Sequence, residues 1–129
     1  MVRSYAAAIA QGLRANIWYS VKGWLNSGFV NPDLSPTPAY SAFQFGRSEL
    51  GDAKFTGDIT VADIGGVSGV EGYKFLRGDR RIWLLWSLDG DPHSINLSEA
   101  PLAAWDALGN PVSPTASMNV TLNPLYLEW

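Results

Sequence analysis

The segment NIWYSV, residues 16–21, constrains the fold of this chain more than any other. Its residues are mostly β-branched or aromatic and barely alternate with polar ones, which is typical of a strand buried on both faces in a parallel sheet covered by helices. Apolar residues at three- and four-residue steps predict a helix on each side of it, over residues 3–14 and 38–51. A parallel strand needs neighbouring strands joined to it by crossovers, and the sequence offers no second strand of this type.

Each predicted helix has an apolar stripe and recognisable end signals. Gly12 and Asn16 are both stop signals for the first helix, and the second is expected to start at the cap residue Thr37 with Pro38 in its first turn. The stripe of the first helix comprises Tyr5, Ala8, Ile9 and Leu13. That of the second comprises Tyr40, Phe43 and Leu50, with Ala39 and Ala42.

From residue 53 onward the apolar period changes from that of a helix to that of a strand. Residues 70–77 and 80–88 predict the two arms of a hairpin that turns at Gly78-Asp79. The second arm is apolar on both faces, with Ile82 on one and Trp83 on the other, which indicates a central strand. Further short strands follow at intervals marked by turn residues. The expected fold is therefore mainly β, an antiparallel β-sandwich of about six to eight strands preceded by an α-β-α unit.

Composition excludes several classes of function. The net charge of −3 argues against nucleic-acid binding, because no basic stripe is available to neutralise phosphates. No run approaches the roughly 20 apolar residues that span a bilayer, so no membrane partner is expected. The chain has no cysteine and a single histidine, His93, and the segment DGDPH lacks the carboxylates that a calcium loop needs. We therefore expect no metal and no cofactor, while the cellular location stays open.

Five segments, in this order, resemble the C-terminal end of a clan A glycoside hydrolase of the family 39 or family 5 type. They are GLRANIWYSVKGW, GFVNPDLSPTPAYSAFQF, GVEGYKFLRGDRRIWLLWS, WDALGNPV and LNPLYLEW. The resemblance implies that residues 1–52 are the last helix-strand-helix portion of a (β/α)8 barrel and that residues 53–129 form the C-terminal β-sandwich domain. Residues 16–21 would then be the eighth barrel strand, and the first seven strands would lie outside this chain.

The resemblance also implies that the chain has no catalytic residue of its own. Such enzymes use two glutamates about 5 Å apart, at the ends of barrel strands four and seven, and both would lie upstream of this chain. None of Glu49, Glu71, Glu99 and Glu128 matches those positions, so the chain is not expected to be an enzyme by itself. Trp18 or Tyr19, near the end of the eighth strand, would correspond to an aromatic residue that stacks on substrate in the parent barrel.

Three functions follow as alternatives. The first is a non-catalytic accessory β-sandwich that braces the catalytic barrel of its parent enzyme. The second is a carbohydrate-binding module for oligo- or polysaccharides, with Trp83 as the candidate sugar-stacking residue, although alternating aromatic residues more often fill a core. The third is a subunit that joins a separately encoded barrel. In each case residues 3–30 would lack their barrel neighbours, so we expect them to be disordered, re-packed onto the sandwich or paired with a second copy of the chain.

Overall fold

The computed structural model describes residues 1–13, 17, 21–22 and 28–129. Within them the chain forms two α-helices, one 3-10 helix and eight strands. The helices are α1 (Val2–Ala10), α2 (Pro38–Leu50) and the 3-10 helix η1 (Val61–Ile64). The strands are β1 (Lys54–Asp58), β2 (Val70–Arg77), β3 (Arg80–Ser87), β4 (His93–Asn96), β5 (Ala103–Trp105), β6 (Pro111–Val112), β7 (Ser117–Val120) and β8 (Leu125–Glu128).

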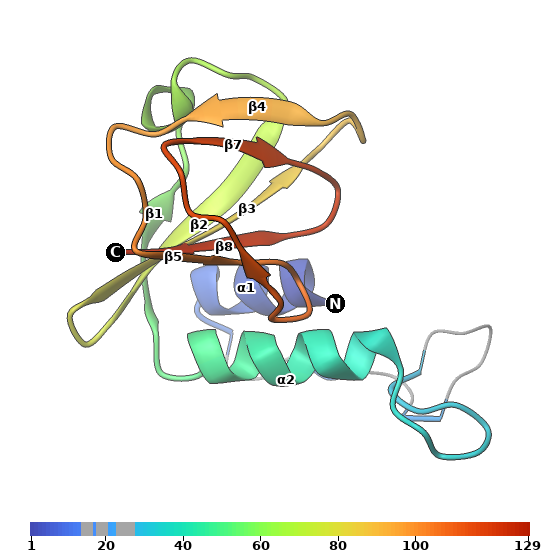
Figure 1. Ribbon diagram of the computed structural model, residues 1–129. Helices are drawn as coiled ribbons and strands as arrows, with labels where there is room; N and C mark the ends of the chain where they lie inside the picture. Colours follow the sequence, from blue (N-terminus) through green and yellow to red (C-terminus); the bar gives the residue numbers. More distant parts are fainter. Residues whose placement is uncertain (14–16, 18–20, 23–27) are drawn as a thin grey trace.

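The strands form two sheets, and every pairing between them is antiparallel. Six strands make the larger sheet in the order β1-β2-β3-β8-β5-β6, and β4 pairs with β7 in the smaller one. Figure 1 shows the β4–β7 pair on one side of the larger sheet and the helices on the other. The prediction of a mainly β, sandwich-like fold is therefore confirmed, with the helices as a third layer.

The β2–β3 hairpin follows the sequence prediction closely. Arg77 pairs with Arg80, which leaves Gly78 and Asp79 as a two-residue turn. Gly78 has φ +59°, the left-handed conformation that a type II′ turn requires at its first central residue. Strand β3 lies between β2 and β8, so the prediction of a central strand is correct.

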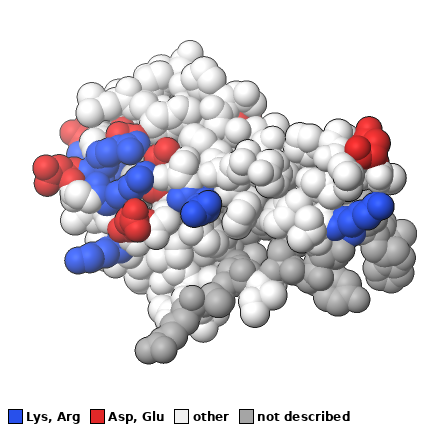
Figure 2. Space-filling model, turned by 90° about the horizontal axis from the view of Figure 1, so that it is seen from below, with Lys and Arg blue, Asp and Glu red and all other residues white. Residues whose placement is uncertain are grey.

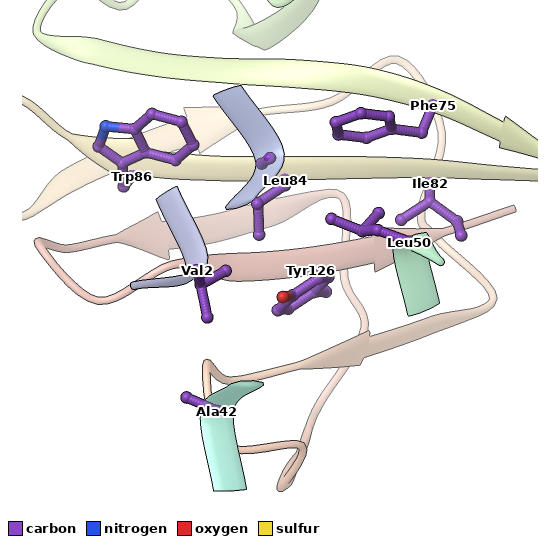
Figure 3. Close-up of a cluster of buried hydrophobic side chains, with 9 residues drawn as sticks. Val2, Ala42, Leu50, Phe75, Ile82, Leu84, Trp86 and Tyr126 are labelled. Carbon is purple, nitrogen blue, oxygen red and sulfur yellow. The ribbon is translucent and has the colours of Figure 1, made fainter. Parts of the chain in front are cut away.

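The larger sheet buries a hydrophobic core on each of its faces, because β3 and β8 alternate. Leu84 and Tyr126 point to the helices, and Leu85 and Leu127 point to the β4–β7 pair. The helix-side core is drawn in Figure 3, where the labelled side chains are Val2, Ala42, Leu50, Phe75, Ile82, Leu84, Trp86 and Tyr126. Aromatic residues of the hairpin and of β8 thus fill a core, which is the more common role of alternating aromatic residues in a strand.

Helix α1 is shorter than predicted and ends in a Schellman motif. Gly12, at φ +67°, donates its N–H to the carbonyl of Ile9, and the N–H of Leu13 reaches the carbonyl of Ala8. Of the two stop signals in the sequence, Gly12 ends the helix, and Asn16 lies outside the described residues. Leu13 lies past the helix and is 62% exposed, so its assignment to the buried stripe was wrong.

Within residues 3–30, the first helix packs on the larger sheet, since Ala6 belongs to the core and Tyr5 and Ile9 pack against it. Whether this placement differs from that in a parent barrel stays a prediction. The expected strand at 16–21 lies outside the described residues except for Ile17 and Val21, which are exposed and in no strand. The boundary at residue 52 stays a prediction, although α1 and α2 share one core with strands beyond it.

Candidate functional site

The apolar side chains of helix α2 occupy a wider part of the helix surface than the part that the sheet buries. Ala42, Gly46 and Leu50 are buried toward the sheet. Tyr40 and Phe43, predicted to be buried with Leu50, instead lie half-buried to one side of this stripe. At about 100° per residue, the apolar positions of the predicted stripe spread over roughly 160° of the helix surface, from Ala42 on one side to Tyr40 on the other. The sheet buries only the side with Ala42, Gly46 and Leu50, which is why Tyr40 and Phe43 remain half-buried.

Tyr40 and Phe43 border a groove of about 530 Å³ between α1, α2 and the end of β2. We call it the helix groove, and its lining includes the aromatic residues Tyr5, Tyr40 and Phe43 and the charged residues Arg47, Arg77 and Asp52. The Phe43 ring meets that of Tyr5 edge-on, with 6.2 Å between centroids. Arg47 has no hydrogen-bond or ion-pair partner for its guanidinium among the described residues. The groove thus combines aromatic walls with an available cation.

Charge is unevenly spread over the helix side of the molecule. Figure 2 shows most of the charged side chains gathered at one end of this face, with a smaller acidic and basic group at the opposite end. At the hairpin end Arg77 donates to the carbonyl of Ser48 on α2. Arg77, next to the turn, therefore fastens the hairpin to α2.

Two glutamates meet at Arg80, far apart in sequence but adjacent in the fold. The Arg80 guanidinium lies 3.0 Å from Glu49 of α2 and also pairs with Glu128 of β8. These hydrogen bonds, that to Glu128 above all, raise the pKa of Arg80. Both carboxylates are occupied by the guanidinium, and neither lines the helix groove. The pair is therefore suited to joining the C-terminal strand to α2.

Trp83 lies on the face of the larger sheet that points away from the helices. The sequence alone did not decide between a core position and a sugar-stacking position for this residue. Its ring is half-buried, 4.8 Å from the centroid of Trp129, with the Lys74 ammonium 5.2 Å from its own centroid. Lys74 is itself held by Asp63, at 2.7 Å. Burial opposes ionisation of Asp63, yet its hydrogen bonds with Lys74 and Thr60 outweigh that effect and lower the pKa of the carboxyl. Trp83 therefore stands in a fixed, ion-paired setting.

The DGDPH segment forms a local hydrogen-bonded turn. Asp89 accepts from Ser87 and lies 2.8 Å from Nε2 of His93, and these contacts lower the pKa of Asp89 to about 2. Ser87 and His93 both contact the carboxylate of Asp89 and do not hydrogen-bond to each other. A nucleophilic serine needs its histidine within hydrogen-bond reach, so this arrangement does not form a catalytic triad.

Trp18 and Tyr19, the candidate substrate-binding residues, lie outside the described residues. Among those described, no three His, Asp or Glu side chains gather closely enough to hold a metal ion. In the same part of the chain, no helix is long and apolar enough to cross a membrane.

Comparison with known proteins gives one solved structure of interest. The sequence matches no family model, and it matches no curated protein. A family 39 glycoside hydrolase from the gut symbiont Bacteroides cellulosilyticus WH2 superposes on 98% of the chain, with a TM-score of 0.73 and 15% sequence identity. The match covers 28% of that chain, so the present chain spans little more than a quarter of the enzyme it resembles in fold.

Proposed function

We propose that the chain is the non-catalytic C-terminal portion of a glycoside hydrolase and that it braces the catalytic barrel of its parent enzyme. The observation that carries the proposal is that 98% of this chain superposes on only 28% of a family 39 enzyme. The shared core of the helices and the larger sheet supports it, because such a core makes the two layers one rigid unit.

The helix groove is the surface suited to bracing. Tyr5, Tyr40 and Phe43 are half-buried there, so covering the remaining surface of each would contribute about half of the roughly 1.5–3 kcal/mol expected for full burial of such a side chain. Arg47 adds a cation that suits an acidic residue on the barrel. A barrel segment that is apolar and carries a carboxylate would complement both features.

The chemistry of hydrolysis is assigned to the parent barrel. Retaining glycosidases need an acid/base carboxyl and a nucleophilic carboxylate about 5 Å apart, facing a cleft that admits the sugar. The glutamates that meet at Arg80 are engaged in ion pairs outside the helix groove. We therefore expect the purified chain to leave aryl glycosides and oligosaccharides unhydrolysed.

The test begins with the DNA upstream of the Met1 codon. A frame encoding the rest of a (β/α)8 barrel with two suitably placed glutamates is expected. The encoded barrel, produced separately, should gain thermal stability and glycosidase activity when the purified chain is added. A stop codon between the two frames, together with this complementation, would identify the chain as a separately encoded subunit. Hydrolysis by the chain alone, or no barrel frame upstream, would refute the proposal.

A matched pair of variants tests the groove. Phe43→Gln removes an aromatic wall, and Leu102→Gln changes a side chain that is 80% exposed in the bend before β5, away from the groove lining. The first should weaken the complementation at least tenfold in the concentration of chain required, and the second should leave it unchanged. Equal effects of the two variants would place the contact elsewhere.

A further inference from the structure

We propose that a hollow beside Trp83, on the face of the larger sheet away from the helices, binds a neutral sugar ring. The hollow has a volume of about 450 Å³ and lies between Trp83, the 3-10 helix η1 and the end of β4. We call it the Trp83 hollow, and its polar lining residues are Asp63, Asn96 and Ser98. This site goes beyond the bracing function, because it lies on the side opposite the helix groove.

The first requirement of a sugar site is a fixed aromatic surface, and Trp83 meets it. Trp129 lies against its ring, and Lys74 is held near the ring by the ion pair with Asp63. A ring packed in this way loses little freedom when a ligand binds. The part of Trp83 that borders the hollow therefore offers a pre-positioned apolar surface to the C–H groups of a sugar.

The second requirement is a set of hydrogen-bonding groups that are not already used. Asp63 receives all its hydrogen bonds and its ion pair at Oδ2, from the N–H and hydroxyl of Thr60 and from Lys74. Its Oδ1 has no partner in the described part of the chain, and neither do the side-chain amide of Asn96 and the hydroxyl of Ser98. A carboxylate oxygen, an amide and a hydroxyl together match the donor and acceptor pairs of vicinal sugar hydroxyls.

The backbone fixes these groups relative to one another. Gly65 follows η1 with φ +78°, and a Cβ built on it would lie 2.9 Å from the Cβ of Asn96. The end of η1 therefore packs directly against the end of β4, as Figure 1 also shows. Thr60 and Asp63 form a capping box that holds η1 in place. Asp63 and Asn96 thus come from separate elements but belong to one rigid wall.

Charge selects a neutral ligand over an anion. Lys74 is neutralised by Asp63, and Arg81, which lies over Trp129, is paired with Glu99 at 2.6 Å. No unpaired cation lines the hollow among the described residues, so a phosphate or sulfate has no counter-charge there. A pyranose, with apolar C–H faces and hydroxyls at its rim, matches the arrangement.

The experiment titrates the full chain with xylotetraose, cellotetraose and mannotetraose, and follows amide and tryptophan side-chain NMR shifts. At least one of them is expected to bind saturably in the millimolar range, with shifts concentrated at Trp83, Asp63 and Asn96. Inorganic sulfate, as the anionic probe, is expected to shift none of these signals.

Three variants sharpen the result. Trp83→Leu should abolish saturation, and Asn96→Ala should weaken binding at least fivefold. Asn119→Ala is the matched control, since it changes an exposed asparagine on the partner strand β7. Thermal unfolding of each variant checks that the fold is retained.

Absence of saturable shifts with all three oligosaccharides would overturn the proposal, as would equal effects of Asn96→Ala and Asn119→Ala. Either failure would leave the bracing function standing, because that function is tested on the helix groove by complementation.

Discussion

The contact between Gly46 of α2 and Tyr126 of β8 gives a sharp test of how the helix sits on the sheet. A Cβ built on Gly46 would lie 3.0 Å from the Tyr126 hydroxyl oxygen, closer than the ordinary contact distance of about 3.5 Å. That hydroxyl is buried and has no hydrogen-bond partner among the described residues. Gly46 and Tyr126 therefore form a pair in which each residue limits the other.

The magnitudes follow from two opposing effects. Gly46→Ala in a helix interior should gain about 0.5–1 kcal/mol of stability from backbone propensity. The added methyl group presses on the hydroxyl, and overpacking of this kind costs about 1–3 kcal/mol. Tyr126→Phe removes a buried, unpaired hydroxyl and should stabilise the fold by about 1 kcal/mol. With the hydroxyl gone, Gly46→Ala should become stabilising.

The assay is a double-mutant cycle measured by urea unfolding, followed by circular dichroism at the helix band. We expect Gly46→Ala alone to destabilise by about 1 kcal/mol and the coupling energy of the pair to reach about 2 kcal/mol. Tyr73→Phe, at a half-buried tyrosine of the same core, is the control and should show no coupling to Gly46→Ala. Additive effects at Gly46 and Tyr126 would refute the placement of α2 against β8.

Three further predictions concern polar contacts. Arg80→Met removes the bridge between Glu49 and Glu128. Because Arg80 is 40% exposed, the loss should lower the free energy of unfolding, measured with urea, by about 1 kcal/mol at low salt and by less in 1 M salt. A loss that salt does not reduce would contradict the ion-pair explanation. The contacts of Asp89 lower its folded pKa from 3.8 to about 2, so the stabilisation from these contacts is present above pH 4 and is lost as the pH falls toward 2. The difference in unfolding free energy between the unmodified chain and Asp89→Asn should therefore shrink across that pH window. A difference that stays constant would show that these contacts do not stabilise the fold. Asp106→Ala removes the carboxylate that accepts three hydrogen bonds in the β5–β6 turn, and it should lower the unfolding free energy by about 1–2 kcal/mol. Asp106→Asn should lower the unfolding free energy by less. Equal losses for the two variants would show that the turn does not depend on these hydrogen bonds.

The parts of the fold that the sequence predicted are those encoded locally. The β2–β3 hairpin depends on a two-residue turn and on alternation in adjacent segments, so its arms, its turn and the central position of β3 followed directly. The end of α1 depends on Gly12, and Pro38 stands in the first turn of α2, as expected from the sequence. Thr37 occupies the N-cap position, but its hydroxyl donates to the carbonyls of Gly28 and Phe29, so the expected side-chain cap is not formed.

The parts that sequence reasoning missed depend on contacts between distant segments. β4 and β7 pair across more than 20 residues, and that pairing covers one face of the larger sheet. The sequence could not predict which apolar residues of α2 face the sheet and which face the groove, because that depends on where the sheet lies. For the candidate sites, the sequence named Trp83 but gave no signal for Asp63 or Asn96, because η1 and the end of β4 meet only in the folded chain.

The order of the layers has a consequence for how the two proposed surfaces relate. The helix groove lies on one side of the larger sheet and the Trp83 hollow on the other, and each face of that sheet has its own hydrophobic core. A barrel docked on the helices would therefore leave the hollow open, since the sheet and the β4 side lie between them. Sugar binding at Trp83 should consequently have the same affinity in the free chain and in the complex with the barrel, and competition between barrel and oligosaccharide would show that one of the two surfaces has been misplaced.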